Sequence, residues 1–74
     1  MRRSRLLLEC AQAHANRREV TEAVHALVTA ERTSHEAIAA IPWARTLADD
    51  LAQDAPPASQ ASARALATRL RSVV

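Results

Sequence analysis

Apolar side chains recur at helical spacing along almost the whole chain, and short polar or proline-containing segments interrupt them. Spacings of three and four residues place side chains on one face of an α-helix. The pattern predicts no strand and five helices, over residues 4–16, 19–32, 34–40, 42–53 and 60–72. We therefore expect an all-α fold, in which an antiparallel helix pair is followed by three further short helices in a small bundle.

Helix start signals support these boundaries. Three serines stand where an N-cap is expected, namely Ser4, Ser34 and Ser59, because a serine hydroxyl accepts a bond from the first free backbone N–H groups. Pro42 suits a first helical position, where its missing N–H is not needed. Paired prolines favour extended backbone. We therefore divide the chain into a helical repeat with following helices (1–53), a Pro-rich linker (54–59) and a C-terminal capping helix (60–74).

Each predicted helix has an expected packing face. In the first helix it is the stripe Leu7, Cys10, Ala11 and His14. In the second it is Val20, Ala23, Val24, Leu27, Ala30 and Glu31, with His25 on the opposite face. The remaining helices contribute Ile38 and Ile41, then Trp43, Leu47 and Leu51, then Leu66, Leu70 and Val73. We expect Trp43 to anchor the core; the alternative is a contact with a partner, because Trp is enriched at interface centres.

Composition excludes several classes of protein. The 74 residues include 18 Ala, no Gly and a single Cys. Phosphate-binding loops and dinucleotide fingerprints need Gly, and disulfide frameworks and multi-cysteine zinc sites need more Cys. No apolar run is long enough to cross a membrane. A chain this short buries a small share of its surface, so we expect a partner or a second copy to stabilise it.

Charge is segregated along the chain, although the net charge is only +2. Residues 1–18 carry +4, residues 19–54 carry −5 and residues 55–74 carry +3. The basic residues that could contact phosphates are Arg2, Arg3, Arg5, Arg17 and Arg18. No aromatic side chains accompany them for stacking on bases. The apolar stretch after the first arginines is too short for a signal peptide, so we expect a cytoplasmic protein without a membrane segment.

Candidate chemistry is sparse. Cys10 and His14 lie four residues apart on one helix face, a spacing that can hold a metal ion. The alternative, which we favour, is that both belong to the apolar seam of the first helix. Nothing in the sequence indicates an oxyanion hole or an orienting acid beside the thiol. We therefore expect no catalytic residue, no bound metal and no cofactor.

The first two helices resemble a tetratricopeptide repeat. The positions that carry the resemblance are Leu7, Cys10, Ala11 and His14 in the first helix and Ala23, Leu27 and Ala30 in the second. In such repeats Ala11 and Ala23 would mark the close helix crossing. Departures are His14 at a position usually held by Tyr, and Arg17 at a turn that usually has Gly. The resemblance implies a peptide-binding groove on the other face of the first helix, formed here by Arg5, Leu8, Glu9, Gln12, Ala15 and Asn16.

Over residues 5–72 the order of four short motifs resembles the C-terminal end of Xre-type helix-turn-helix transcriptional regulators from high-GC bacteria. These motifs are AQAHA (11–15), ALVTAER (26–32), PWARTLADDL (42–51) and ALATRL (65–70). The family's DNA-binding domain has no counterpart in this sequence, so only its helical interaction module carries over. The chain is expected to be either a stand-alone module or the tail of a longer regulator.

The resulting expectation is a non-enzymatic protein-interaction or sensory module. Its expected partner is protein, either a second copy or the remainder of a helical-repeat array, and DNA would be reached only through a separate domain. The alternative is a small DNA-associated regulator that uses its basic N-terminal arm.

Overall fold

The computed structural model of the protein describes the backbone of residues 2–71 and the side chains of residues 3–71. Over these residues the fold is all-α, as predicted, with five helices and no strand. The helices are α1 (Arg2–Asn16), α2 (Val20–Thr33), α3 (His35–Ala39), α4 (Pro42–Asp54) and α5 (Pro57–Arg71). The predicted contribution of Val73 to the last helix lies outside the described residues.

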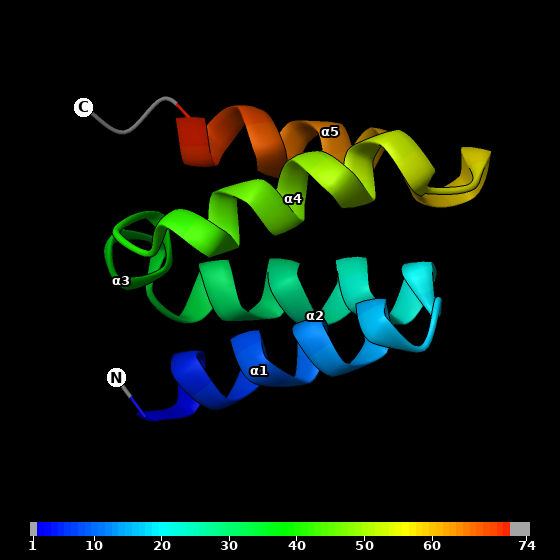
Figure 1. Ribbon diagram of the computed structural model, residues 1–74. Coiled ribbons are helices and arrows are strands. Elements are labelled where there is room, and N and C mark those ends of the chain that lie inside the picture. Colours follow the sequence, from blue (N-terminus) through cyan, green and yellow to red (C-terminus); the bar gives the residue numbers. More distant parts are fainter. Residues whose placement is uncertain (1, 72–74) are drawn as a thin grey trace.

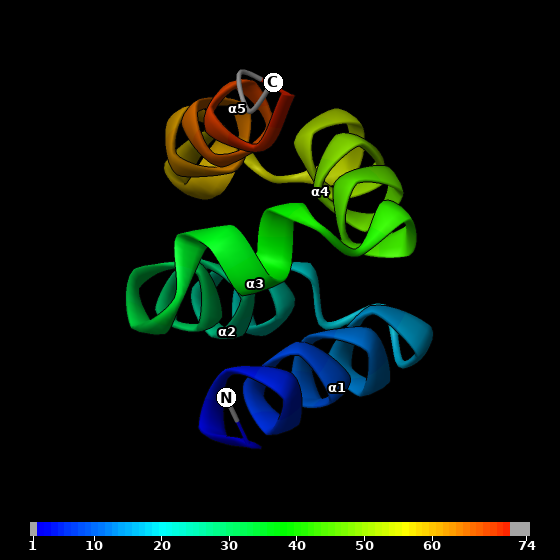
Figure 2. The same cartoon turned by 90° about the vertical axis from the view of Figure 1, so that its left-hand side faces the viewer.

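The four long helices form two antiparallel hairpins that stack on each other (Figure 1). We call α1 and α2 the first hairpin, and α4 and α5 the second hairpin. Figure 2 shows the second hairpin lying over the first, with short α3 between them; α1 lies at one side of the stack and α5 at the other, and both α4 and α5 contact α2. As a result, α1 and α5 are the two outermost helices, and each has a face with no neighbouring helix.

Local chemistry explains most helix ends. The Ser34 hydroxyl accepts a bond from the backbone N–H of Ala37 at 3.4 Å, and Pro42 occupies the first turn of α4, as predicted. The last helix begins at Pro57, three residues earlier than expected, since proline is also tolerated in a first helical turn. Ser59 therefore lies inside α5 instead of capping it, and its hydroxyl donates to Thr21 Oγ1 at 3.3 Å.

The turn between α1 and α2 uses an arginine where helices usually use glycine. Arg18 has a φ of 62°, in the left-handed region. The backbone N–H of Glu19 donates to the carbonyl of His14 at 2.9 Å, and that of Arg18 donates to Ala15 at 3.0 Å. These two bonds define a Schellman motif, which closes a helix C-terminus. The chain thus makes a tight helical turn without glycine, at the cost of one strained residue.

The buried face of α1 differs from the predicted one by about one residue. Leu8 and Ala11 are fully buried, whereas Cys10 is exposed and Leu7 is only half-buried. The stripe through Ser4, Leu8 and Ala11 has the same helical spacing as the predicted one, so the sequence pattern allowed both. Because three leucines follow one another at residues 6–8, periodicity did not show which of them faces α2.

The predicted face of α2 is confirmed except at Val20, which is half-buried. Its buried residues are Ala23, Val24, Leu27, Ala30 and Glu31, and His25 is exposed on the other side. In α4 the buried residues are Ala44, Leu47, Ala48 and Leu51. Trp43 lies beside this stripe with 37% of its surface exposed, so the prediction that it anchors the core is wrong. Trp43 lies in the first turn of α4, at the edge of the molecule. Of the predicted stripe, Leu47 and Leu51 are buried.

The two hairpins share one burial pattern, displaced by 40 residues. Six buried positions of the first hairpin are buried again in the second: Ser4 and Ala44, Leu8 and Ala48, Ala11 and Leu51, Ala23 and Ala63, Leu27 and Ala67, Ala30 and Leu70. Helix α3 lies in the connection and contributes to this displacement, which exceeds the roughly 34 residues of tetratricopeptide repeats. The chain is therefore a tandem of two equivalent hairpins.

Candidate functional site

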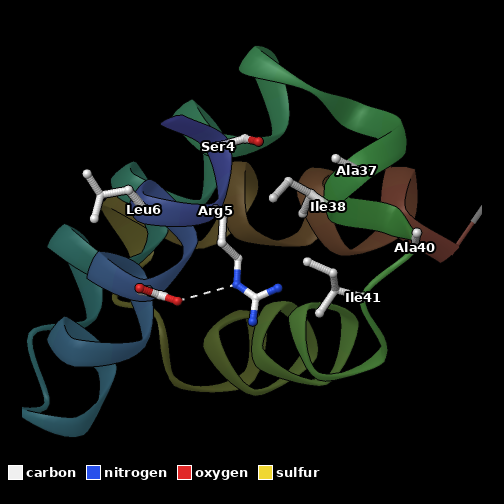
Figure 3. A pocket seen from close by; sticks show the side chains of 8 residues that line it. Ser4, Arg5, Leu6, Ala37, Ile38, Ala40 and Ile41 are labelled. Carbon is white, nitrogen blue, oxygen red and sulfur yellow. Dashed lines mark hydrogen bonds and ion pairs between the residues drawn. The ribbon is translucent and has the colours of Figure 1, made fainter. Parts of the chain in front are cut away.

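A groove of about 730 Å³ opens to solvent where the N-terminal half of α1 meets α3 and the short segment that follows α3. Its lining consists of Ser4, Arg5, Leu6, Glu9, Ala37, Ile38, Ala40 and Ile41. Figure 3 shows Ile38 and Ile41 pointing into this groove, and Arg5 extending across it from α1. Because Ile38 is fully buried and Ile41 is half-buried, the walls of the groove are continuous with the hydrophobic core.

The ionic groups of the groove are held together. Arg5 Nε lies 3.4 Å from Glu9 Oε2, one helical turn further along α1. The Arg5 guanidinium carbon also lies 6.0 Å from the centroid of the Trp43 ring, within the range of a weak cation–π contact. The long Arg5 side chain therefore links α1 to α4 across the groove. A ligand in the groove would meet carbon surface and one charge that is partly neutralised by Glu9.

Two large apolar side chains are exposed in the described structure, and both belong to this region. They are Leu6, with 62% of its surface exposed, and Trp43, with 37%. Leu6 lines the groove, and Trp43 contacts it through Arg5. Single exposed apolar residues are ordinary, but their concentration beside an apolar hollow is typical of interaction sites.

The structure brings together part of the predicted binding face. Arg5 and Glu9 line the groove, as the predicted partner surface requires. Leu8, assigned to the same surface, is instead fully buried against α2, which follows from the shifted face of α1. Gln12 and Asn16 lie beyond the groove on α1 and bond to each other, with Gln12 Nε2 donating to Asn16 Oδ1 at 3.1 Å.

Sequence reasoning missed the other wall of the groove. That wall comes from α3 and the segment that follows it, through Ile38 and Ile41. Both isoleucines had been assigned to the core of a short helix, which holds for Ile38. The available signal was the proximity of Ile41 to Pro42: a proline fixes the end of the short helix and leaves the preceding residue extended.

The predicted packing positions of the helix pair divide into two groups. Ala11, Ala23, Leu27 and Ala30 are fully buried, which agrees with their expected place at the helix crossing. Cys10 and His14 do not pack in a common seam. Cys10 carries a free, exposed thiol, and His14 Nδ1 lies 2.7 Å from Glu19 Oε1 at the turn. Among residues 3–71 no group of three or more His, Cys, Asp or Glu side chains could hold a metal ion.

A separate ionic cluster joins the two hairpins away from the groove. The Glu31 side chain is 7% exposed and accepts bonds from Arg69 Nε at 3.1 Å and Arg69 Nη2 at 3.1 Å. His35 Nδ1 lies 2.6 Å from Glu31 Oε2. Burial raises the pKa of the Glu31 carboxyl, but the hydrogen bonds from Arg69 and His35 lower it more, so its pKa lies below the usual value for Glu. This cluster is structural: it fixes α5 and the start of α3 onto α2.

The basic residues of the N-terminal segment do not form one surface. Arg3 and Arg5 lie near the start of α1, whereas Arg17 and Arg18 lie in the turn after its end. A helix of this length separates them by about 20 Å. The side chain of Arg2 lies outside the described residues.

No protein-family model, curated protein or solved structure matches the chain. In the part of the chain that the structure describes, no helix is both long and apolar enough to span a membrane.

Proposed function

We propose that this protein is a non-enzymatic helical interaction module that binds apolar side chains of a partner protein helix in the groove between α1, α3 and the segment that joins α3 to α4. The observation that supports this function is the open groove, which continues the hydrophobic core and is bordered by Leu6 and Trp43, the exposed large apolar residues of the described structure. Helices dock in such grooves through apolar residues spaced three and four positions apart.

The lining favours a helix over a small polar substrate. Enzyme and cofactor sites combine an apolar cavity with several convergent polar groups that fix the ligand's orientation. Here the ionic groups in the lining, Arg5 and Glu9, are paired with each other. The groove also opens to solvent, which gives an apolar stripe of a partner access to Ile38 and Ile41.

The motif order adds a biological setting to the proposal. It resembles the helical tail of Xre-type regulators, and a module of this kind would serve sensing or assembly in the bacterial cytoplasm. The short chain agrees with such a role, because a small domain gains stability when a partner covers part of its surface. In this setting contact with DNA would be made by another domain or another protein.

The experiment uses a synthetic helix as probe. A peptide of about 15 residues, with a leucine stripe and uncharged glutamine flanks, would match the length of α1. Trp43 is the chain's single aromatic residue and contacts Arg5 of the groove lining, so its fluorescence can report on occupation of the groove. We expect a saturable change in emission. We expect Ile41→Ala to weaken binding about tenfold, since half-buried methylene groups are lost from the contact.

Val28→Ala is the matched control, because Val28 is also a half-buried β-branched residue but lies between α2 and α5. Its loss of packing should resemble that of Ile41→Ala while leaving the peptide affinity unchanged. The proposal is overturned if no helical peptide binds whatever its flanking charge, or if both variants weaken binding equally.

A further inference from the structure

The equivalence of the two hairpins supplies an internal comparison for their outer faces. On α2, the surface that faces the second hairpin contains Val24, Val28 and Glu31. The equivalent positions on α5, 40 residues later, are Arg64, Thr68 and Arg71, and all three are exposed. From Ala58 to Arg71 no exposed side chain of α5 is both apolar and larger than Ala. Thus the only exposed apolar side chains over these residues of α5 are the alanines Ala58, Ala61 and Ala65, so a further hairpin would find much less apolar surface there than on α2.

The outer face of α1 is more apolar than the equivalent face of α4. Leu6, Cys10 and Ala13 form an exposed stripe with helical spacing. The equivalent positions on α4 are Thr46, Asp50 and Gln53, which are also exposed but polar, as expected of a solvated face. Since Leu6 also lines the groove, the stripe and the groove form one continuous apolar surface at the α1 end of the stack. We call it the α1 surface.

Charge around the α1 surface selects among possible partners. Residues 3–18 carry one Glu and four Arg, two near each end of α1, for a net charge of +3 along the length of the helix. Two copies of the protein that met through this surface would bring the same arginines together, which disfavours symmetric self-association. Nucleic acid would use the arginines but leave the apolar stripe and groove uncovered. A helix with acidic residues beside its apolar stripe satisfies both features of the surface.

We infer that the partner is an amphipathic helix with an acidic flank, which packs along α1 as an additional layer of the helical stack, while α5 closes the opposite end. This inference rests on the proposed function, because it specifies what fills the groove. It also assigns a direction to assembly: partners add at the α1 end only. The leucine stripe of the partner would cover Leu6, Cys10 and Ala13, and its acidic flank would face the arginines of residues 3–18.

Three synthetic helices with the same leucine stripe and with glutamate, glutamine or lysine flanks test the charge. We expect the glutamate helix to bind about tenfold more tightly than the lysine helix at low salt, from a few exposed ion pairs. The difference should shrink as salt is added. If all three bind equally, the inference is overturned while the proposed function stands. If none binds, both fail.

Two matched Ala→Asp variants test whether the partner helix binds at α1 or at α5. Ala13→Asp adds a charge to the exposed stripe of α1, and Ala61→Asp adds the same charge to the exposed face of α5. We expect the first to weaken binding of the glutamate helix about tenfold, by repulsion and loss of apolar contact, and the second to leave it unchanged. Circular dichroism should show equal helix content for both variants.

Three results would overturn the inference. These are an equal loss of affinity in both variants, a loss only in Ala61→Asp, or unchanged binding in both. Light scattering on the unmodified protein supplies the remaining arm: a dimer that Ala13→Asp dissociates would show that a second copy, not an acidic helix, occupies the α1 surface. Binding of a short DNA duplex that competes with the glutamate helix would also contradict it.

Discussion

The two hairpins bury equivalent positions with different side chains. Leu8 and Leu27 of the first hairpin correspond to Ala48 and Ala67 of the second, whereas Ala11 and Ala30 correspond to Leu51 and Leu70. Large and small residues thus exchange places between equivalent sites. Helices pack well where a large side chain on one helix faces a small one on the other, and either helix can supply the large residue. The comparison shows that one backbone arrangement accommodates two complementary sets of core residues.

The hairpins also differ in how their charges are held. In the first hairpin, Glu31 is buried and bonded on two sides, by Arg69 and His35. In the second, Asp49 and Arg71 form a pair at 2.7 Å that is largely exposed. Mutation of a buried group with several hydrogen bonds lowers the free energy of unfolding far more than mutation of an exposed ion pair does. We therefore expect mutation of Glu31, which joins the first hairpin to Arg69 of the second, to have a larger effect than mutation of Asp49.

The largest effect is expected from Leu8→Ala. This side chain is fully buried, and its truncation should destabilise the protein by about 2–5 kcal/mol through lost burial and the cavity left behind. Cys10→Ala, two residues away on the exposed face of α1, should change stability by less than about 0.5 kcal/mol. Urea unfolding followed by circular dichroism checks both. Equal losses would mean that α1 is rotated relative to the face described above.

A smaller effect is expected from Glu31→Gln. Replacing the buried carboxylate weakens its bonds to Arg69 and His35 and should cost about 2 kcal/mol at neutral pH. A loss of this size lowers the melting temperature of a small domain by roughly 10 °C. Thermal unfolding at neutral pH measures it. A variant as stable as the original protein would show that the cluster does not hold the hairpins together.

The same cluster predicts a dependence on pH. Because the pKa of Glu31 is lower in the folded protein than in the unfolded chain, its contribution is fully present above about pH 4.5 and is lost as the pH falls through the folded pKa. We expect the stability of the original protein to decrease more steeply below this pH than that of Glu31→Gln. Asp49→Asn is the matched control. Parallel curves for the original protein and Glu31→Gln would contradict the expected linkage.

Stabilisation is expected at the turn of the first hairpin. Arg18 adopts a left-handed conformation that costs a residue with a Cβ atom about 1 kcal/mol, so Arg18→Gly should raise stability by about that amount. Arg17→Gly, at the neighbouring position of the same turn, lacks this gain and should be neutral or destabilising. Thermal unfolding of the two variants compares them. A gain in Arg17→Gly alone would contradict the assigned turn geometry.

The smallest effect is expected in the second hairpin. Asp49→Asn removes an exposed ion pair with Arg71 and should cost less than about 0.5 kcal/mol, a change that added salt also produces in the original protein. A loss as large as that of Glu31→Gln would remove the distinction between the two hairpins. Urea unfolding at low and high salt provides the measurement.

The sequence predicted the helices well because local signals determined them. Proline at residue 42 and serine at residue 34 act on their own helix ends and need no tertiary context. The face of α2 was also predicted, because its valines, alanines and leucine leave a single apolar stripe. The face of α1 was not, since three adjacent leucines support more than one stripe. Only contact with α2 and α3 decides that Leu8 is inside.

The candidate site was also predicted only in part, because the pattern within one helix says nothing about residues that other segments bring beside it. Arg5 and Glu9 were assigned to the partner surface, and they line the groove. Ile41 reaches the groove, and Trp43 reaches its neighbour Arg5, through the path of the chain after α3, which periodicity does not describe. The 40-residue equivalence of the hairpins was not visible in the sequence, because leucine and alanine exchange places between them. Equivalent positions are buried in both hairpins but differ in residue type.

The central claim is that the two ends of the helical stack differ, with an adhesive α1 surface and a closed α5 face. Mapping backbone amide shifts by NMR during titration with the glutamate-flanked helix tests it most directly. The account predicts shifts confined to α1, to residues 37–41 and to the first turn of α4, with α5 unaffected beyond its ends. Shifts concentrated in α5, or spread evenly over both hairpins, would contradict it.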